Sequence, residues 1–399
     1  MAKKGCRKTM GVILGAVLAF IALAFTALFI ISGIFQKPAY LEPWDKDSAQ
    51  KFDDPRIQLA AHGLLAANGH NMQPWKIRLD ENDPMVFYLY ADSERFTGEV
   101  DPLARQMMIT QGTFLEYIAI AGDELGYQTN MELFPQGDYN EHDLSGSMDA
   151  TPVAKITIAK AAPQSAPLYD AMFLPDTNRA PYQSAKLTSE QIMELENISA
   201  DPNITIKIFQ NEEDLTQLGS YAMQAASVEA GVERVMKESE VIFRANEYQK
   251  NQYRYGFSVE GQGTTGVMRH LMQGLVTLFP SMNRGKAASD VFIESTRTSI
   301  ENTPAYAMII TKDNTRPTQV KSGMLYSKLI LAARQMGLVM QPLSQVLEEY
   351  PEMNALYSGI HQDYAPGGGT IQMLVRLGQP TKEVVQSMRR DVMDLIVGG

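Results

Sequence analysis

Apolar positions along this chain recur with two different periods, and the alternation of the two periods predicts a mixed helix and strand structure. Between residues 54 and 67 the apolar side chains return every three or four positions, as on one face of a helix. Two shorter stretches, at 76–79 and 85–90, have the pattern of strands. A long helix is expected next, over residues 103–127, and then a strand over residues 153–159.

A second cycle of elements begins near residue 187. A helix is expected at 187–198, where Thr188 stands as the N-cap and Gln191 follows three residues later, the pattern of a capping box. The remaining expected elements are a strand at 204–209, a helix at 214–235, a strand at 305–310, a helix at 320–336 and a last strand at 370–377. The order predicts a helix-rich α+β fold that is built twice.

A long apolar run near the N-terminus predicts a membrane-spanning helix. Residues 10–35 contain no charged side chain, and they exceed the ~20 apolar residues that cross a bilayer. A cleaved signal peptide is the alternative, but its apolar core is only about 7–15 residues long and ends in a small-x-small site, which residues 33–37 lack. Basic residues precede the run and mixed charges follow it, so the positive-inside rule places the large domain outside the cytoplasm. We therefore expect a single-pass protein with a basic tail at 1–9 and a tether at 36–54.

The charge balance and the scarcity of cysteine and histidine limit the function classes. Removing the four basic residues of the tail from the 35 Lys and Arg leaves 31 against 46 Asp and Glu, so the soluble part is acidic and repels nucleic acid and anionic lipid. Cys6 is the sole cysteine, which excludes a disulfide within the chain. The five histidines form no H-x-x-x-H or H-E-x-x-H pair, and the chain has no G-x-S-x-G elbow or P-loop. No metal centre and no serine hydrolase is expected.

The segment 68–75 reads Asn-Gly-His-Asn-Met-Gln-Pro-Trp and joins an expected helix to an expected strand. Side-chain amides such as those of Asn71 and Gln73 donate and accept hydrogen bonds at once, which suits the edge of a heteroaromatic ring such as a flavin. Pro74 fixes the backbone where the chain turns. The segment therefore predicts a ligand-facing turn, with a capped surface turn as the alternative.

Several motifs together resemble the flavin-binding nitroreductase superfamily, and more narrowly its Acg-like branch. That branch carries a Gly-His-Asn-x-Gln-Pro-Trp turn, here at 69–75, and a following Asp-Pro-x-x-Arg, here at 101–105. Gly112, which marks close packing or close approach of a ligand, belongs to the same match. The match covers roughly residues 50–380, and continues through Thr177-Asn178-Arg179, residues 323–337 and residues 374–378.

The resemblance implies an α+β nitroreductase-like fold. Nitroreductases are usually dimers with the flavin bound where two subunits meet, and the Acg-like branch resembles such a dimer fused into one chain. We therefore expect two tandem halves, at 55–174 and 175–399, with one complete flavin site built from both. An obligate dimer is not expected, because the two halves are already fused.

The resemblance also implies FMN as the cofactor. A guanidinium meets a phosphate through two parallel hydrogen bonds, so Arg179 and Arg376 are the expected phosphate ligands. Asp176 stands where a basic residue or His is often found, and its charge is expected to weaken phosphate binding. The other implied contacts are Thr177 and Asn178 in the motif of Arg179, Asn71 and Gln73 at the ring or ribityl chain, and the backbone of Gly337 and Leu338, in the loop 336–342, near the reactive ring nitrogen. The alternatives are salt bridges for the arginines and a helix C-cap for Gly337.

Residues 240–285 are expected to form a lid-like segment. Within it, residues 261–266 match the G-x-G-x-x-G pattern of dinucleotide-binding folds. That pattern should follow a buried strand, whereas residues 253–260 are polar and aromatic. A flexible entrance loop is therefore preferred to a pyrophosphate loop.

The function implied by the resemblance is two-electron transfer by a ping-pong mechanism. A donor, NAD(P)H or a membrane quinol, reduces the flavin and leaves, and a nitroaromatic or quinone acceptor then takes the electrons. The flavin carries this chemistry, so no side chain is expected to act as a catalytic acid or base. Two alternatives stay open: a protein that binds or sequesters flavin without turnover, and a degenerate fold that lost the cofactor and acts as a membrane-tethered interaction module.

Overall fold

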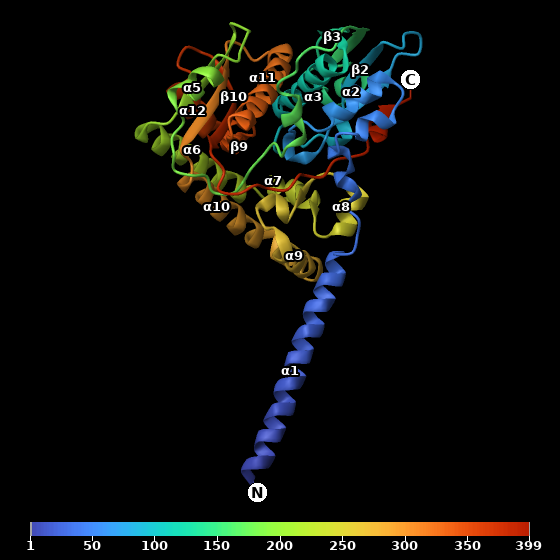
Figure 1. Ribbon diagram of the computed structural model, residues 1–399. Helices are drawn as coiled ribbons and strands as arrows, with labels where there is room; N and C mark the ends of the chain where they lie inside the picture. Colours follow the sequence, from blue (N-terminus) through green and yellow to red (C-terminus); the bar gives the residue numbers. More distant parts are fainter. Residues whose placement is uncertain (1, 399) are drawn as a thin grey trace.

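One long helix projects from the rest of the molecule. The computed structural model describes residues 2–398, and α1 (Ala2–Ser32) extends away from the domain (Figure 1). Met10–Ser32 is the one stretch in this described part that is long and apolar enough to cross a membrane. The helix ends at Ser32 and not at residue 35 as predicted, because Gly33 takes a left-handed backbone conformation with φ of 77°.

The segment 36–54, predicted as a tether, packs against the domain. It forms two short 3₁₀ helices, η1 (Ala39–Trp44) and η2 (Ser48–Lys51), in which Tyr40 and Trp44 are buried. The Trp44 indole N–H donates to the carbonyl oxygen of Ser387 (2.8 Å) near the other end of the chain. The connection between α1 and the domain is therefore fixed by buried aromatic side chains.

The first sheet combines strands of the N-terminal half with the end of the chain. Its strand order is β11-β1-β2-β4-β3, and β11 runs parallel to β1 with Ile396 in register with Ile77. The other pairs are antiparallel. The strands are β1 (Trp75–Leu79), β2 (Val86–Ala91), β3 (Tyr127–Leu133), β4 (Ala154–Lys160) and β11 (Ile396–Val397). The helices α2 (Pro55–Gly63), α3 (Arg105–Leu125) and α4 (Leu144–Ala150) contribute side chains to the same apolar core.

The second sheet has the order β5-β8-β10-β9, and all its pairs are antiparallel. Every residue of β8 is buried, which explains its unbroken apolar sequence. The strands are β5 (Ile204–Phe209), β8 (Ala305–Thr311), β9 (Val339–Pro342) and β10 (Thr370–Gly378). The surrounding helices are α5 (Ser189–Glu196), α6 (Glu212–Gly231), α10 (Gly285–Glu301), α11 (Arg316–Gln335) and α12 (Asn354–Tyr364).

The two sheets share one connectivity. Leaving β11 aside, the strands of each sheet lie side by side in the chain order first, second, fourth, third. In each sheet a long helix, α3 or α11, connects the second strand to the third. These two helices pack against each other in the middle of the molecule (Figure 1).

The lid, residues 240–285, lies between α1 and the two sheets (Figure 1). It begins with the last two residues of α7 (Glu233–Val241) and contains mainly short elements. These are β6 (Phe243–Arg244), α8 (Glu247–Tyr253), β7 (Phe257–Ser258), η6 (Glu260–Gln262), α9 (Gly266–Leu278) and η7 (Pro280–Asn283). The two-residue strands β6 and β7 pair with each other in parallel, apart from both larger sheets.

The elements predicted from periodicity are present with shifted ends, and several corrections are needed. The capping box at Thr188 is confirmed, because its hydroxyl accepts from the Gln191 N–H and the Gln191 side chain accepts from the Thr188 N–H. The helix predicted at 214–235 is divided at Val232 into α6 and α7. The predicted loop 336–342 contains strand β9. The predicted second half does not keep all its strands, since β11 pairs in the first sheet. Several elements are not among the predictions, namely β3, α4, α10, α12, β11 and the short helices and strands of the lid.

Candidate functional site

The turn at 68–75 joins α2 to β1, and its backbone is strained. His70, Asn71 and Gln73 all have positive φ, at 53°, 52° and 51°. Non-glycine residues in this conformation cost of order 1 kcal/mol or more each and persist only where the surroundings enforce them. Part of that enforcement comes from Asn68, whose Oδ1 accepts from the Gln73 N–H (2.8 Å). Three strained residues in one turn point to a functional role.

The side chains of Asn71 and Gln73 connect this turn to the lid and to the C-terminal strap, which comprises residues 379–398. Asn71 Nδ2 donates to the carbonyl oxygen of Gly256 in the lid (3.2 Å). Gln73 Oε1 accepts from the backbone N–H of Arg390 in the strap (2.8 Å). Both amides are engaged by protein groups, and their contact with a flavin ring stays a prediction.

Arg389 of the strap connects segments that are far apart in the chain. Its side chain is fully buried, and its guanidinium carbon lies 4.5 Å from the centre of the Trp44 ring. Its Nη1 donates to Asn71 Oδ1 (3.1 Å), and its Nη2 donates to the Leu65 carbonyl (2.8 Å) and to Asp176 Oδ2 (3.1 Å). One side chain thus fixes the N-terminal segment, the strained turn and the loop that carries Arg179.

Arg179 and His70 lie near each other, and both contact the lid, His70 at the Phe257 ring and Arg179 at Gly261; the polar area that they share is called the recess below. The Arg179 side chain keeps solvent access although protein surrounds it, and burial lowers the pKa of its guanidinium. Its Nη1 donates to the carbonyl oxygen of Gly261 in the lid (3.2 Å). Burial, and secondly the charge of Arg179, lower the pKa of His70 to about 4. The recess therefore presents one accessible positive charge beside a neutral imidazole at neutral pH.

Asp176, expected to weaken phosphate binding, has a cationic partner of its own. Arg389 pairs with it at 3.1 Å from the fully buried side. Its negative charge is therefore balanced by Arg389, and the repulsion of a phosphate at Arg179 is smaller than the sequence suggests.

A buried hydroxyl lies close to the same charged residues. Tyr326, on α11, is buried within range of the charges of Asp176 and Arg179; burial is the largest cause that raises its pKa. Its hydroxyl has no hydrogen-bond partner among the described residues. A buried polar group left unpaired costs about 1–3 kcal/mol. A ligand oxygen in the recess would satisfy it, so the residues present fit a phosphate group at this place.

Arg376, the second predicted phosphate ligand, is fully buried with its donors used by the protein. Its Nε donates to Gln341 Oε1 (2.7 Å) and its Nη2 to the Ala180 carbonyl (2.8 Å), while its guanidinium carbon lies 3.8 Å from the centre of the Tyr182 ring. These contacts hold the loop that carries Arg179. Arg376 is thus placed to position the loop, and its direct contact with phosphate stays a prediction.

The neighbours of Arg179 in its motif also stabilise that loop. Asn178 is buried, its Nδ2 donates to the Lys382 carbonyl in the strap (3.0 Å), and its Oδ1 accepts from the Ala180 N–H (2.9 Å). Thr177 is half-buried beside it. Of the three motif residues, Arg179 is the most exposed.

The backbone N–H groups of Gly337 and Leu338 complete the C-terminal end of α11. They donate to the carbonyl oxygens of Arg334 (3.1 Å) and Ala333 (2.8 Å), and Gly337 has φ of 71°. This is the geometry of a glycine C-cap, the alternative given above. The position of these two N–H groups near a reactive ring nitrogen of a flavin stays a prediction.

The lid is bonded to both sides of the recess. The N–H of Gly256 in the lid donates to the Asn71 carbonyl (3.0 Å), and the carbonyl oxygen of Gly261 accepts from Arg179 Nη1 (3.2 Å). The strand before the G-x-G-x-x-G segment is β7, which has only two residues. That context does not match the long buried strand of a dinucleotide-binding fold, and it agrees with an entrance loop.

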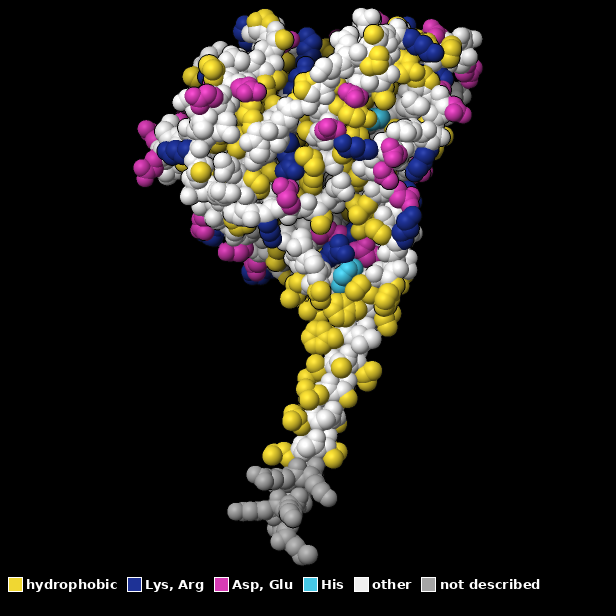
Figure 2. Space-filling model, viewed as in Figure 1, with side chains coloured by type: hydrophobic (Ala, Val, Ile, Leu, Met, Phe, Trp, Pro, Cys, Tyr) yellow, Lys and Arg dark blue, Asp and Glu magenta, His cyan; other side chains and the backbone are white. Residues whose placement is uncertain are grey.

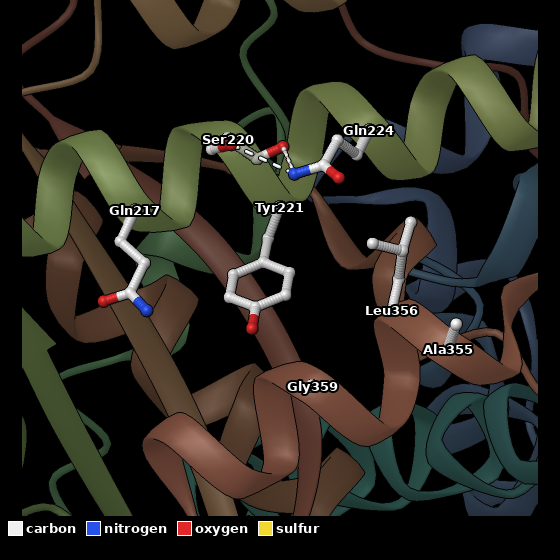
Figure 3. Close-up of a pocket in the computed structure, with 7 residues that line it drawn as sticks. All are labelled: Gln217, Ser220, Tyr221, Gln224, Ala355, Leu356 and Gly359. Atoms are coloured by element: carbon white, nitrogen blue, oxygen red, sulfur yellow. Dashed lines mark hydrogen bonds between the residues drawn. The ribbon is translucent and has the colours of Figure 1, made fainter.

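A surface groove of about 360 Å³ lies elsewhere, between α6 and α12 (Figure 3). Tyr221 projects across it towards Gly359, and its hydroxyl donates to Asp363 (2.7 Å). The residues that line it are Gln217, Ser220, Tyr221, Gln224, Ala355, Leu356 and Gly359, and none of them is a predicted site residue. No group of three or more His, Cys, Asp or Glu side chains placed to hold a metal ion occurs within residues 2–398.

Comparison with known proteins finds similarity in structure. The fold is similar to that of nitroreductase-like flavoproteins. No protein-family model and no curated protein matches the chain. A nitroreductase-like family protein from Bacillus cereus is 13% identical, with 59% of this chain and 96% of that chain covered and a TM-score of 0.30.

Two further structures give similar values. The FMN-dependent nitroreductase NfnB from Mycobacterium smegmatis, in complex with NADPH, is 12% identical to this chain. The match covers 52% of this chain and 84% of NfnB, with a TM-score of 0.30. A BluB-like flavoprotein from Clostridium difficile is 11% identical, with 58% and 97% covered and a TM-score of 0.32.

Proposed function

We propose that this protein is a membrane-anchored oxidoreductase that binds FMN in the recess between the turn at 68–75 and Arg179. Two observations carry the proposal: the Arg179 guanidinium is accessible, and its charge acts on the buried Tyr326, whose hydroxyl has no partner among the described residues. A charged donor beside a hydroxyl suits a phosphate dianion, which accepts hydrogen bonds. FMN, when bound, supplies two-electron transfer, and the protein binds and orients it.

The shared strand order of the two sheets supports a fused-dimer origin. Four strands and one long helix follow the same connectivity in each half. The recess takes His70 from the first half and Arg179 and Tyr326 from the second. One chain therefore supplies both walls of the proposed site, and an obligate second subunit is not needed.

The end of α1 supports an uncleaved anchor in place of a signal peptide. Ser32 is fully buried, and its hydroxyl lies 3.2 Å from His270 Nδ1 in the lid. A Cβ on Gly33 would lie 3.0 Å from the Tyr248 ring. Removing α1 would expose these contacts, so we propose that the helix stays attached and crosses the membrane, with the domain outside the cytoplasm.

The test measures FMN and riboflavin binding by the full-length protein in detergent, through quenching of flavin fluorescence. Arg179→Gln removes a charge-assisted contact to the phosphate, worth about 1.5–3 kcal/mol. The affinity for FMN should therefore fall about 10- to 100-fold, while the affinity for riboflavin, which lacks the phosphate, should hardly change.

Arg297→Gln is the matched control, because Arg297 lies on α10 with its side chain 51% exposed. It should leave both affinities as they are. Equal weakening of FMN and riboflavin by Arg179→Gln would contradict the phosphate contact. Absence of binding to either flavin would contradict the proposed cofactor.

A flavin-sequestering protein without turnover is the second candidate, favoured by the hydrogen bonds that hold the lid at Asn71 and at Arg179. Anaerobic reduction separates the two. NADPH or a quinol should bleach the bound flavin of an oxidoreductase, and a nitroaromatic or quinone should restore its colour. Flavin that is bleached by dithionite alone would favour sequestration.

A further inference from the structure

An apolar surface lies at the base of the domain, beside α1. Figure 2 shows hydrophobic side chains gathered where α1 leaves the domain. A group of large apolar residues this exposed marks an interaction surface. We call it the basal patch; its members are Val267 (71% exposed), Met268 (54%), Leu278 (49%) and Phe279 (56%) of the α9 region, Met282 (41%) of η7, and Phe35 (85%) just after α1.

The middle of α9 is fixed to the protein. His270 is buried against Ser32, at the end of α1. Gly274 allows the two helices to touch, because a Cβ at this position would come within 2.9 Å of the Leu28 Cβ. α9 is thus held by α1 near its middle, and the exposed apolar side chains at its two ends belong to the basal patch.

The length of α1 places this contact at a membrane boundary. Met10–Ser32 has 23 residues. At about 1.5 Å per residue it spans roughly 34 Å, slightly more than the ~30 Å hydrocarbon core. Leu28 then lies near the outer edge of that core, and α9, which crosses α1 there, lies at the level of the lipid headgroups.

The charges of this segment also differ from those of the rest of the domain. Residues 266–284 contain no Asp or Glu, whereas the whole chain carries a net charge of −11. Two arginines lie in this segment: Arg269, 26% exposed and 3.9 Å from Glu247, follows the first apolar pair, and Arg284 is exposed at the end of the segment. Apolar side chains bordered by cations suit the boundary between acyl chains and phosphate headgroups.

We propose that α9 and η7 bind the surface of the lipid bilayer and lie in its plane beside α1. The inference rests on the membrane anchoring in the proposed function. The basal patch continues the exposed apolar surface of α1, which favours lipid over a second copy of this chain as the occupant. Because α9 follows Gly261 within the lid, the cover of the recess then stands at the membrane surface.

The test uses the full-length chain with Cys6→Ser, reconstituted at one copy per phosphatidylcholine nanodisc. Single cysteines at Phe279→Cys and Val267→Cys, at the two ends of α9, carry an environment-sensitive fluorophore. Lipids with a spin label near the headgroup or near the acyl end quench it by depth. Phe20→Cys in α1, 73% exposed, is the buried-in-lipid reference, and Met193→Cys in α5, 61% exposed, is the control far from the membrane.

Both α9 labels should be quenched several-fold more than the label at Met193, and more by the shallow spin label than by the deep one. Phe20 should show the opposite depth preference. Labels on α9 that behave like Met193 while Phe20 is quenched would overturn the proposal. A signal seen only with two copies per disc would assign the patch to a second copy, and would overturn it too.

The same samples test the membrane anchoring and the flavin site by two independent measurements. An unquenched label at Phe20 would show that α1 does not cross the bilayer, which removes the basis of the proposal. Flavin content measured on those samples reports the cofactor part of the proposed function, and it does not depend on quenching.

Discussion

Gly112 on α3 and Gly323 on α11 face each other where the two long helices cross. A Cβ on Gly112 would lie 2.9 Å from the Gly323 Cα, and a Cβ on Gly323 would lie 3.0 Å from the Gly112 Cα. Each would also overlap a carbonyl oxygen of the other helix, that of Val320 or of Ile109. Both carbonyls stand three residues before the facing glycine, so the contact is reciprocal.

The first residues of the same helices repeat this reciprocity. Arg105 begins α3 and its Nη1 donates to the Gln372 carbonyl (2.6 Å) in the second sheet. Arg316 begins α11 and its Nε donates to Glu141 Oε1 (2.9 Å) in the first half. Each long helix therefore begins with an arginine that bonds to the part of the molecule around the other sheet.

Replacement of either glycine by alanine should destabilise the protein strongly. In Gly112→Ala or Gly323→Ala the new methyl group cannot be accommodated without separating the helices, so the free energy of unfolding should fall by about 3 kcal/mol or more. Gly231→Ala, at the end of α6, meets open space and should have little effect. Chemical denaturation in detergent measures all three. Equal stability of Gly112→Ala and Gly231→Ala would refute the packing.

The long helices were accessible to sequence reasoning because their apolar period is local. The sequence predicts close packing or close approach of a ligand at Gly112, and in the structure Gly112 packs against Gly323. The pairing of Ile77 with Ile396 could not be predicted in the same way. No local pattern records which distant strand completes a sheet, and β11 is only two residues long.

Tyr326→Phe should change stability and FMN affinity in opposite directions. Without the unpartnered hydroxyl, the free protein should be as stable as before or more stable by up to about 1 kcal/mol. If the hydroxyl donates to FMN, the affinity should fall about 3- to 10-fold, the equivalent of one hydrogen bond. Tyr306→Phe is the control, because its hydroxyl is also buried and without a partner among the described residues, but on β8. A common loss of affinity in both variants would exclude a specific contact.

The candidate site was predicted in part, and the reason lies in how its residues are held. The turn at 68–75 and Arg179 belong to short motifs, whose residues are adjacent in the sequence and can therefore be recognised there. Tyr326 and Arg389 cannot, since each acquires its role from residues far away in the chain, such as Asp176. In the structure, Tyr326 is recognised by its buried hydroxyl without a partner among the described residues, and Arg389 by its fully buried charge.

His70 should report the arrival of a phosphate in the recess. Its pKa is lowered to about 4 by burial and by the charge of Arg179. A phosphate bound to Arg179 offsets that charge and favours the imidazolium, so the pKa should rise when FMN binds. Histidine NMR signals followed between pH 4 and 7 should show the rise with FMN and not with riboflavin. His142, exposed on the first half, supplies the reference signal; a pKa of His70 that FMN leaves unchanged would place the phosphate elsewhere.

Two buried carboxyl groups, Glu229 on α6 and Glu348 before η9 (Pro351–Met353), make stability depend on pH. Burial raises the pKa of Glu229 from 4.5 to about 8, and burial followed by the charge of Glu229 raises that of Glu348. The folded protein therefore keeps protons that the unfolded chain releases above its own pKa near 4.5. This contribution to stability is complete below pH 4.5 and is lost as the pH rises through about 8.

Glu229→Gln should remove much of that loss, because the neutral amide copies the protonated acid at every pH. The difference in free energy of unfolding between the variant and the parent should grow in favour of the variant from pH 5 to pH 9. Denaturation midpoints across this range measure it. Glu213→Gln, at an exposed position of the same helix, should run parallel to the parent. If Glu229→Gln also runs parallel, the carboxyl group is not held protonated by its burial, and the pH dependence has another source.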